Sequence, residues 1–133
     1  RLTCILAREF IDSVDELNRL VDFARANGVE QLTATPVNKP DEKVNQNKGV
    51  WDWTARHHLT PESWKAIREY VEINGTKLMT LSHGAVVFDL GGQNLCLNNC
   101  LTVNPDADEL RNLIFFPDGH LRYYWQYQGA ILL

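Results

Sequence analysis

The first 36 residues alternate between strand-like and helix-like patterns, and this alternation constrains the fold more than any other feature. Residues 2–6 (LTCIL) are short, apolar and flanked by charge, as a buried strand is. A helix is predicted next, because Ser13 and Glu16 have capping-box spacing and an Asn-Gly pair can end it. Residues 29–37 (VEQLTATPV) follow as a second strand. Strand, helix and strand with short connections predict a right-handed βαβ unit with parallel strands.

The next segment predicts a second helix and a third strand. Residues 38–49 are polar and interrupted by proline, which favours a surface loop, and residues 50–59 (VWDWTARHHL) are amphipathic. Thr60 then caps a helix that has proline in its first turn. Residues 76–82 (TKLMTLS) are strand-like. The sequence therefore predicts a βαβαβ parallel unit over residues 1–83.

The pattern changes after residue 83. Short apolar and aromatic runs (AVVFDL, QNLCL, NLIFFPD and HLRYYWQY) alternate with Gly-Gly, Asn-Asn and Pro-Asp-Gly punctuation, which is typical of antiparallel strands and hairpins. The fold class is α/β, or α+β when this extension is counted. Residues 84–133 are predicted to be an antiparallel β extension that packs on residues 1–83 as part of a single folded unit.

Composition disfavours several classes of function. A 133-residue chain that is 44% hydrophobic can bury a core, and its net charge of -4 disfavours binding to nucleic acids or anionic membranes. No apolar run is long enough to span a membrane, and three cysteines suit a reducing compartment. We expect a cytoplasmic protein. The chain begins at Arg1 without methionine and ends on an apolar run (GAILL), which predicts a piece of a longer polypeptide.

Cys96 and Cys100 are the most conspicuous candidates for metal chemistry. As part of an extended strand they would lie about 13 Å apart, so only a turn at the two intervening asparagines brings them together. The CxxxC spacing also begins the CxxxCxxC motif of iron-sulfur enzymes, but the third position is Val103. We therefore predict no metal site in this chain, and interpret both cysteines as strand and turn residues.

Histidines and tryptophans have structural interpretations as well. His57 and His58 are adjacent, so on a helix their side chains point in different directions and cannot share a metal; capping or packing is favoured. Trp51, Trp53 and Trp64 lie near basic residues, but helical spacing places Trp64 on an inner face. Packing in a core or lid is favoured over stacking on a nucleic acid.

The ends of the predicted parallel strands are the remaining candidates for a ligand site. No phosphate-binding glycine loop or nucleophile motif is present. Ligands of parallel α/β folds meet the carboxyl ends of the strands. The residues at those ends that we expect to contact substrate are Arg8, Ser82 and His83, with residues 33–35 at the end of the second strand.

The segment RLTCILAREFIDSVDELNRLVDFARANGVEQLTATPVNKP resembles radical SAM proteins where the fourth barrel strand is followed by a helix and the fifth strand. WTARHHLTPESWKAI is similar to the next loop and helix, and KLMTLSHG to the sixth strand. GGQNLCLNNCL and NLIFFPDGHLRYYWQYQGAILL resemble a carboxyl-terminal extension of some members. The resemblance spans nearly the whole chain but includes no diagnostic motif.

This resemblance implies half of a partial (βα)6 barrel, continued by the antiparallel extension. The parent enzyme would hold a [4Fe-4S] cluster and S-adenosylmethionine (SAM), while this chain, without CxxxCxxC, would hold no cofactor and would be inactive alone. Thr3, Thr33 and Thr35 match positions that contact SAM or substrate in the family. The implied partner is the missing amino-terminal half of the barrel, and the free strand edge at residues 2–6 would favour self-association.

Two other functions are consistent with the residues. One is a free-standing α+β binding or interaction module that uses the loop at 38–49 with Trp51 and Trp53 as its recognition surface. The other is a small metal-binding protein that uses Cys96, Cys100 and His83. The substrate, whether a small molecule or a peptide, and the oligomeric state do not follow from the sequence.

Overall fold

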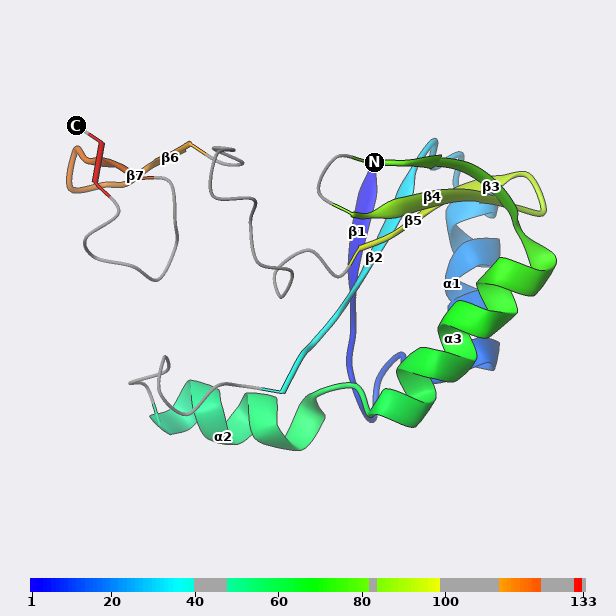
Figure 1. The fold of residues 1–133 in the computed structure, drawn as a ribbon, viewed down its shortest axis with the longest axis horizontal. Coiled ribbons are helices and arrows are strands. Elements are labelled where there is room, and N and C mark those ends of the chain that lie inside the picture. The colour runs from blue at the N-terminus through cyan, green and yellow to red at the C-terminus, as the bar shows by residue number, and fades with distance from the viewer. Residues whose placement is uncertain (40–47, 82–83, 99–112, 123–130, 133) are drawn as a thin grey trace. The chain divides into compact units, whose positions relative to one another are not determined.

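A computed structural model describes residues 1–39, 48–81, 84–98, 113–122, 131 and 132. The chain divides into two compact units, Arg1–Thr102 and Val103–Leu133. Figure 1 shows the helices and strands of the first unit, in which a five-stranded mixed sheet has the order β1-β2-β5-β4-β3. The second unit contains a two-stranded sheet.

The predicted βαβ unit at the start of the chain is confirmed. It consists of β1 (Leu2–Leu6), α1 (Val14–Ala26) and β2 (Leu32–Pro36), and β1 and β2 are parallel over their full length. Ser13 caps α1, since its hydroxyl accepts a hydrogen bond of 3.3 Å from the Glu16 amide. Leu17, Val21 and Ala24 lie on the buried face of the helix, as their spacing predicts.

The chain continues through two helices, α2 (Lys48–His57) and α3 (Pro61–Asn74). The Thr60 hydroxyl caps α3 by accepting from the Ser63 amide at 3.1 Å, with proline in the first turn as predicted. Ile67 and Val71 of α3 are fully buried, whereas α2 buries none of its residues completely. The two helices therefore differ in role, because α3 builds the core and α2 lies at the surface.

The prediction that residues 76–82 form the third parallel strand beside the first two is wrong in its pairing. The segment forms β3 (Thr76–Thr80), which lies at the far edge of the sheet and pairs antiparallel with β4 (Val86–Leu90). β5 (Gln93–Leu97) returns antiparallel to β4 and pairs parallel with β2. A central strand of a parallel sheet is covered on both faces. The buried β5 can take that position beside β2, whereas every residue of β3 is exposed, as at the edge of a sheet.

A tight hairpin produces this arrangement. β4 and β5 are joined at Gly91 and Gly92, both of which have positive φ (58° and 85°), the conformation that two-residue hairpin turns need. The hairpin inserts two strands between β2 and β3. Consequently β1, β2 and β5 are three neighbouring parallel strands, and the sheet continues across the predicted boundary between residues 83 and 84.

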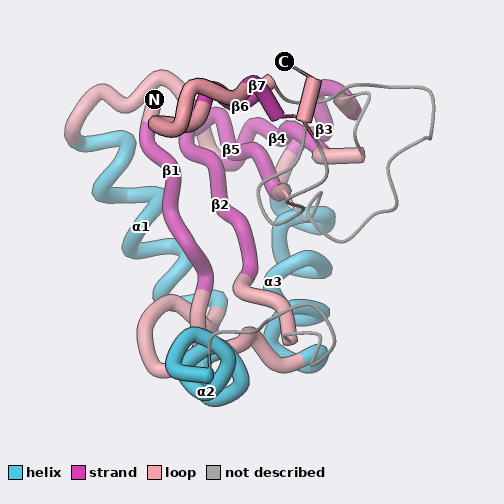
Figure 2. Tube along the Cα trace, turned by 90° about the vertical axis from the view of Figure 1, so that its left-hand side faces the viewer, coloured by secondary structure: helices cyan, strands magenta, loops and turns pink. Residues whose placement is uncertain are grey.

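The main core lies between one face of the sheet and the helices α1 and α3, which we call the helix-covered face. Figures 1 and 2 show both helices on the same side of β1, β2 and β5. The core includes fully buried residues from all these elements: Leu6, Leu17, Leu32, Ile67, Val71 and Leu95. A smaller cluster, Ala85, Val87 and Cys96, lies on the opposite face of the sheet.

The second unit contains a hairpin of β6 (Ile114–Phe115) and β7 (Leu121–Arg122). The predicted turn at residues 117–119 is confirmed. The Arg122 guanidinium lies 4.4 Å from the Phe116 ring centre and also pairs with the Asp118 carboxylate. A backbone hydrogen bond from His120 lowers the pKa of Asp118. Residues 123–127 of the predicted aromatic strand lie outside the described residues.

Over the described residues the fold is therefore mixed α and β, and its five-stranded sheet is open and not a closed barrel. Within the described residues, the helices all fall short of the length and apolar character that a membrane span requires.

Candidate functional site

The face of the sheet opposite α1 and α3 is here called the open face because no described helix packs on it, and it carries the three threonines that the resemblance singled out. Thr3 pairs with Thr33 in the parallel register of β1 and β2, and Ile5 pairs with Thr35. Side chains alternate along a strand, so Thr3, Thr33 and Thr35 share one face. Thr33 and Thr35 are buried, Thr3 is exposed, and Arg1 donates a 3.3 Å hydrogen bond to the Thr33 hydroxyl.

Cys96 of β5 lies on the same face of the sheet as these threonines. It pairs with Thr33 on one side and Val87 on the other, and it is buried on the open face. Cys4 lies on the helix-covered face, where it packs against the main core and where burial raises the pKa of its thiol. Because the two thiols are on opposite faces, they cannot bind one metal ion.

The remaining predicted residues are separated from these. Arg8 is exposed just beyond β1, while Cys100, Ser82 and His83 lie outside the described residues. Among the residues that the structure describes, no group of three or more His, Cys, Asp or Glu side chains is arranged to hold a metal ion. The described residues thus offer no ligand set for a four-iron cluster.

The carboxyl ends of β1 and β2 are joined to the end of α2 by backbone hydrogen bonds. Val37 donates to the Leu6 carbonyl at 2.8 Å, Leu59 donates to the Val37 carbonyl at 2.8 Å, and Arg8 donates to the His57 carbonyl at 3.0 Å. Figure 2 shows α2 lying across this end of the two strands. Surface residues of α2 are therefore brought to the end of the sheet where ligands of parallel α/β folds bind.

A cluster of Glu9, Phe10, Trp53 and His57 forms at this end. The His57 ring centre lies 4.7 Å from that of Trp53 and 5.6 Å from that of Phe10. Its Nδ1 atom lies 3.4 Å from the Arg8 carbonyl and 3.7 Å from the Glu9 carboxylate. His58 points elsewhere, with Nδ1 at 2.8 Å from the Ala55 carbonyl. The prediction that the two histidines diverge is confirmed.

Sequence reasoning missed this cluster. The spacing of Trp53 and His57 on one helix face is a signal that was available, because residues four apart on a helix are neighbours. Glu9 and Phe10 carry no such signal, since they are far from α2 in the sequence.

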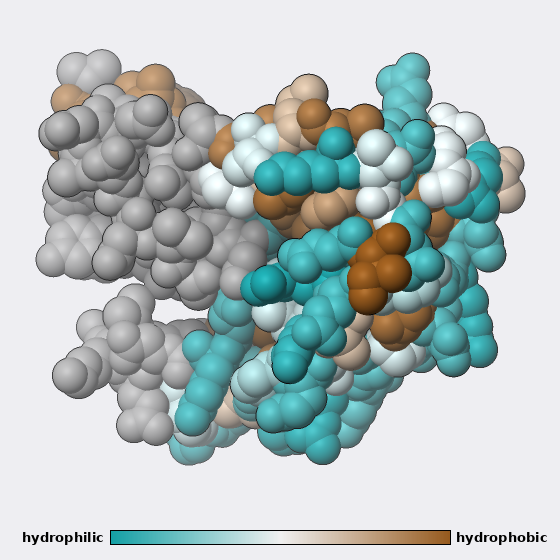
Figure 3. Space-filling view, turned by 45° about the vertical axis from the view of Figure 1, so that its right-hand side comes forward, coloured by the Kyte–Doolittle hydropathy of each residue, from teal (hydrophilic) through white to brown (hydrophobic). Residues whose placement is uncertain are grey.

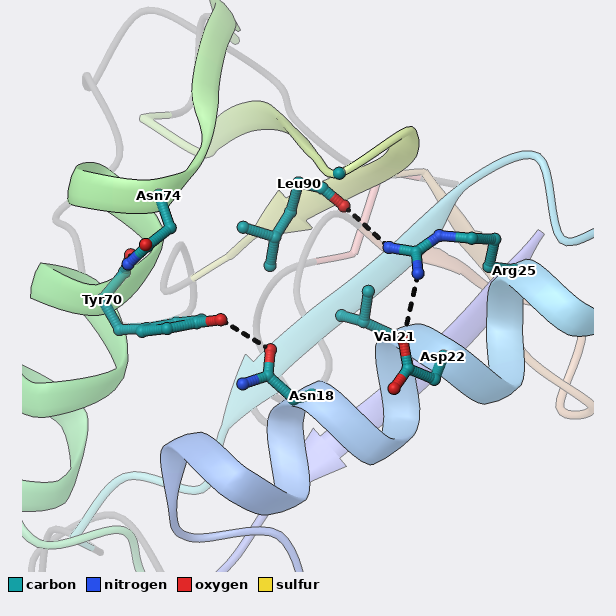
Figure 4. Close-up of a pocket in the computed structure, with 8 residues that line it drawn as sticks. Asn18, Val21, Asp22, Arg25, Tyr70, Asn74 and Leu90 are labelled. Atoms are coloured by element: carbon teal, nitrogen blue, oxygen red, sulfur yellow. Dashed lines mark hydrogen bonds and ion pairs between the residues drawn. The ribbon is translucent and has the colours of Figure 1, made fainter.

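A second site lies between α1 and α3 (Figure 4). It is an open cleft of about 430 Å³, lined by Asn18, Val21, Asp22, Arg25, Tyr70, Asn74, Leu90 and Gly91. Its polar groups bond to one another: Tyr70 donates to Asn18 at 3.0 Å, and Arg25 bonds to Asp22 at 3.0 Å and to the Leu90 carbonyl at 3.2 Å. The cleft adjoins the turn that precedes β5, and therefore lies at the amino end of that strand.

A scan of protein-family models gave no match, and neither did searches of curated proteins and of solved structures. The site must therefore be interpreted from its own geometry.

Proposed function

We propose that this chain is the carboxyl-terminal part of a radical SAM enzyme, in which the open face of β1, β2 and β5 lines the interior of a partial barrel. One observation carries the proposal: three neighbouring parallel strands have described helices on one face only. Parallel sheets are normally covered on both faces, by helices or, in barrels, by helices outside and packed side chains inside. The helix-covered face corresponds to the outside of a barrel.

The order of strands supports a refined form of the proposal. The third barrel strand in this assignment is β5, not residues 76–82, because β5 is the neighbour that runs parallel to β2. Its end leads into Asn98, whose amide donates to the Ala34 carbonyl at 2.9 Å. Asn98, in the middle of the CLNNC segment, would then follow a barrel strand at its carboxyl end, where substrates of such folds bind.

The proposed contacts are hydroxyl groups on the open face. Thr3, Thr33 and Thr35 would face SAM or the substrate, and Arg8 would contact the substrate beyond the end of β1. A four-iron cluster does not fit the described residues, so its ligands belong to the missing amino-terminal half of the barrel. When bound in such enzymes, cluster and SAM together supply a radical that abstracts hydrogen from the substrate.

The missing half would also complete the sheet. β1 is an edge strand of the described sheet: among the strands that the structure describes, its backbone pairs only with β2, and Ile5 is 52% exposed. An edge strand of this kind can accept a further strand. The preceding barrel strand of the parent enzyme is the proposed partner, and self-association is the expected behaviour of the chain when that strand is absent.

Mass-spectrometric sequencing of the native polypeptide tests the proposal. We expect peptides upstream of Arg1 that include CxxxCxxC, and formation of 5'-deoxyadenosine from SAM after reconstitution of that polypeptide with iron and sulfide. A native polypeptide that begins at or near Arg1 would contradict the proposal. In that case a free-standing binding module becomes the better interpretation, and the exposed Phe10 and Trp53 beside His57 favour it.

A further inference from the structure

Two half-exposed aromatic side chains flank His57 at the carboxyl end of β1. Trp53 is 43% exposed and Phe10 is 57% exposed, although both contact the His57 ring. Burying such rings is favourable, so each leaves apolar surface in water that a ligand could cover. The faces of aromatic rings also attract cations, and Trp does so most strongly.

A carboxylate lies beside these rings. The Glu9 side chain is 68% exposed, and His57 Nδ1, 3.7 Å from its carboxylate, forms an ion pair with it only when the imidazole is protonated. The neighbouring guanidinium groups do not neutralise Glu9, since the described part of the chain contains no ion pair between it and Arg8 or Arg56. Arg56 instead donates from Nε to the Asp52 carbonyl at 3.2 Å. The carboxylate is therefore accessible to a cation from solution.

The backbone at Glu9 is held in a strained conformation. Its φ is +71°, the only positive φ at a non-glycine position among the residues described. Two hydrogen bonds fix the turn: the Glu9 amide donates to the Asp12 carboxylate at 2.9 Å, and the Asp12 amide donates to Glu16 at 3.1 Å. Strain of this kind is concentrated at functional sites, where the surrounding structure maintains it. Here it presents the Glu9 carboxylate beside His57.

We propose that Glu9, Phe10, Trp53 and His57 form a binding site for a small organic ammonium group. Two accessible aromatic rings and an accessible carboxylate are the combination that recognises such cations, through ring quadrupoles and charge. The site lies where ligands of parallel α/β folds bind. This inference goes beyond the proposed radical SAM relationship and does not depend on it, because it uses only residues of this chain.

A pair of ligands of the same shape tests the proposal. Choline chloride and its neutral isostere 3,3-dimethylbutan-1-ol are titrated into the chain at constant ionic strength, while the Trp53 indole and the Phe10 and Glu9 amides are followed by NMR. We expect saturable shifts of these signals with choline, and binding of the alcohol that is about threefold to thirtyfold weaker.

Two variants, each with a matched control, assign the effect to the site. Glu9→Gln removes the charge but keeps the shape, and its control is Glu30→Gln at another exposed position. Phe10→Leu removes one ring, and its control is Phe23→Leu, where the side chain is also 57% exposed. We expect each site variant to weaken choline binding about threefold or more, and each control to leave it unchanged.

Three results would overturn the proposal. Equal binding of choline and the alcohol would make the cluster an apolar surface without preference for a cation. If Glu9→Gln bound choline as tightly as the wild type does, the carboxylate would not be part of the site. The absence of saturable shifts in a folded wild-type chain, with folding verified from the same NMR spectra, would show that the cluster binds no ammonium group. None of these results bears on whether the native polypeptide carries CxxxCxxC.

Discussion

The two faces of the parallel strands differ in what their side chains do. The helix-covered face is closed by α1 and α3, and its residues, such as Leu32 and Leu95, are completely buried aliphatics. The open face carries hydroxyls and a thiol at its centre, from Thr33, Thr35 and Cys96. The helix-covered face thus holds the main core, whereas the open face combines a smaller buried cluster with polar side chains.

We expect the greatest loss of stability from a substitution on the helix-covered face. Leu95→Ala should lower the free energy of unfolding by about 2–5 kcal/mol, because it leaves a cavity in the centre of the core. Ile5→Ala on the open face is the control, and should cost less than about 1 kcal/mol since Ile5 is half exposed. Urea denaturation measures both. Equal losses would show that the two faces contribute equally to stability.

A smaller change in the free energy of unfolding is expected at Glu9, just after the end of β1. Glu9→Gly should leave the free energy of unfolding unchanged or raise it by up to about 1 kcal/mol, since glycine adopts a positive φ without strain but costs more entropy on folding. Glu69→Gly, within α3, should cost about 1 kcal/mol. Thermal or urea unfolding of the two variants distinguishes them. A loss at Glu9 as large as that at Glu69 would mean that the turn after β1 is not strained.

Removing a hydroxyl from the open face should change the free energy of unfolding even less. Thr33→Val loses the 3.3 Å hydrogen bond from Arg1, and we expect a change in the free energy of unfolding within about 1 kcal/mol. Thr76→Val, at an exposed position in β3, is the matched substitution. If urea denaturation showed a loss of several kcal/mol at Thr33 only, that hydroxyl would be a structural group and not one available to a ligand.

The smallest effect is the pH dependence due to Cys4, on the helix-covered face. Burial raises the pKa of this thiol above its usual value of 9.0, so the unfolded chain releases the proton at a lower pH than the folded chain does. The stabilising contribution of the neutral thiol is complete below pH 9.0 and is lost as the pH rises towards the folded pKa. Cys4→Ala should lack this loss in urea denaturation between neutral pH and about pH 10. If the free energy of unfolding depended on pH in the same way in the wild type and in Cys4→Ala, the raised pKa of Cys4 would be contradicted.

The sequence was sufficient to predict local structure. Capping residues located the starts of α1 and α3, and the Pro-Asp-Gly turn located the last hairpin. These features depend on contacts between residues close in the sequence, so their patterns are short and specific.

The order of strands and the site were harder to predict. β3 has apolar residues, Leu78 and Met79, but both are about half exposed at the sheet edge, and a short apolar run does not reveal which strand it pairs with. The cluster of Glu9 with His57 depends on a contact between distant segments, and local patterns carry no information about such contacts. The threonines share one face as strand periodicity requires, but their proposed contacts to a ligand remain a prediction.

Hydrogen-deuterium exchange of the native polypeptide, with and without SAM, tests whether the open face of β1, β2 and β5 lines a barrel that binds SAM. If the open face and the strand ends form the inner wall of a partial barrel, SAM should slow exchange at residues 35–38 and leave residues 68–74, beside the cleft between α1 and α3, unchanged. Slower exchange at the cleft alone, or no change in either segment of a folded protein, would contradict the account.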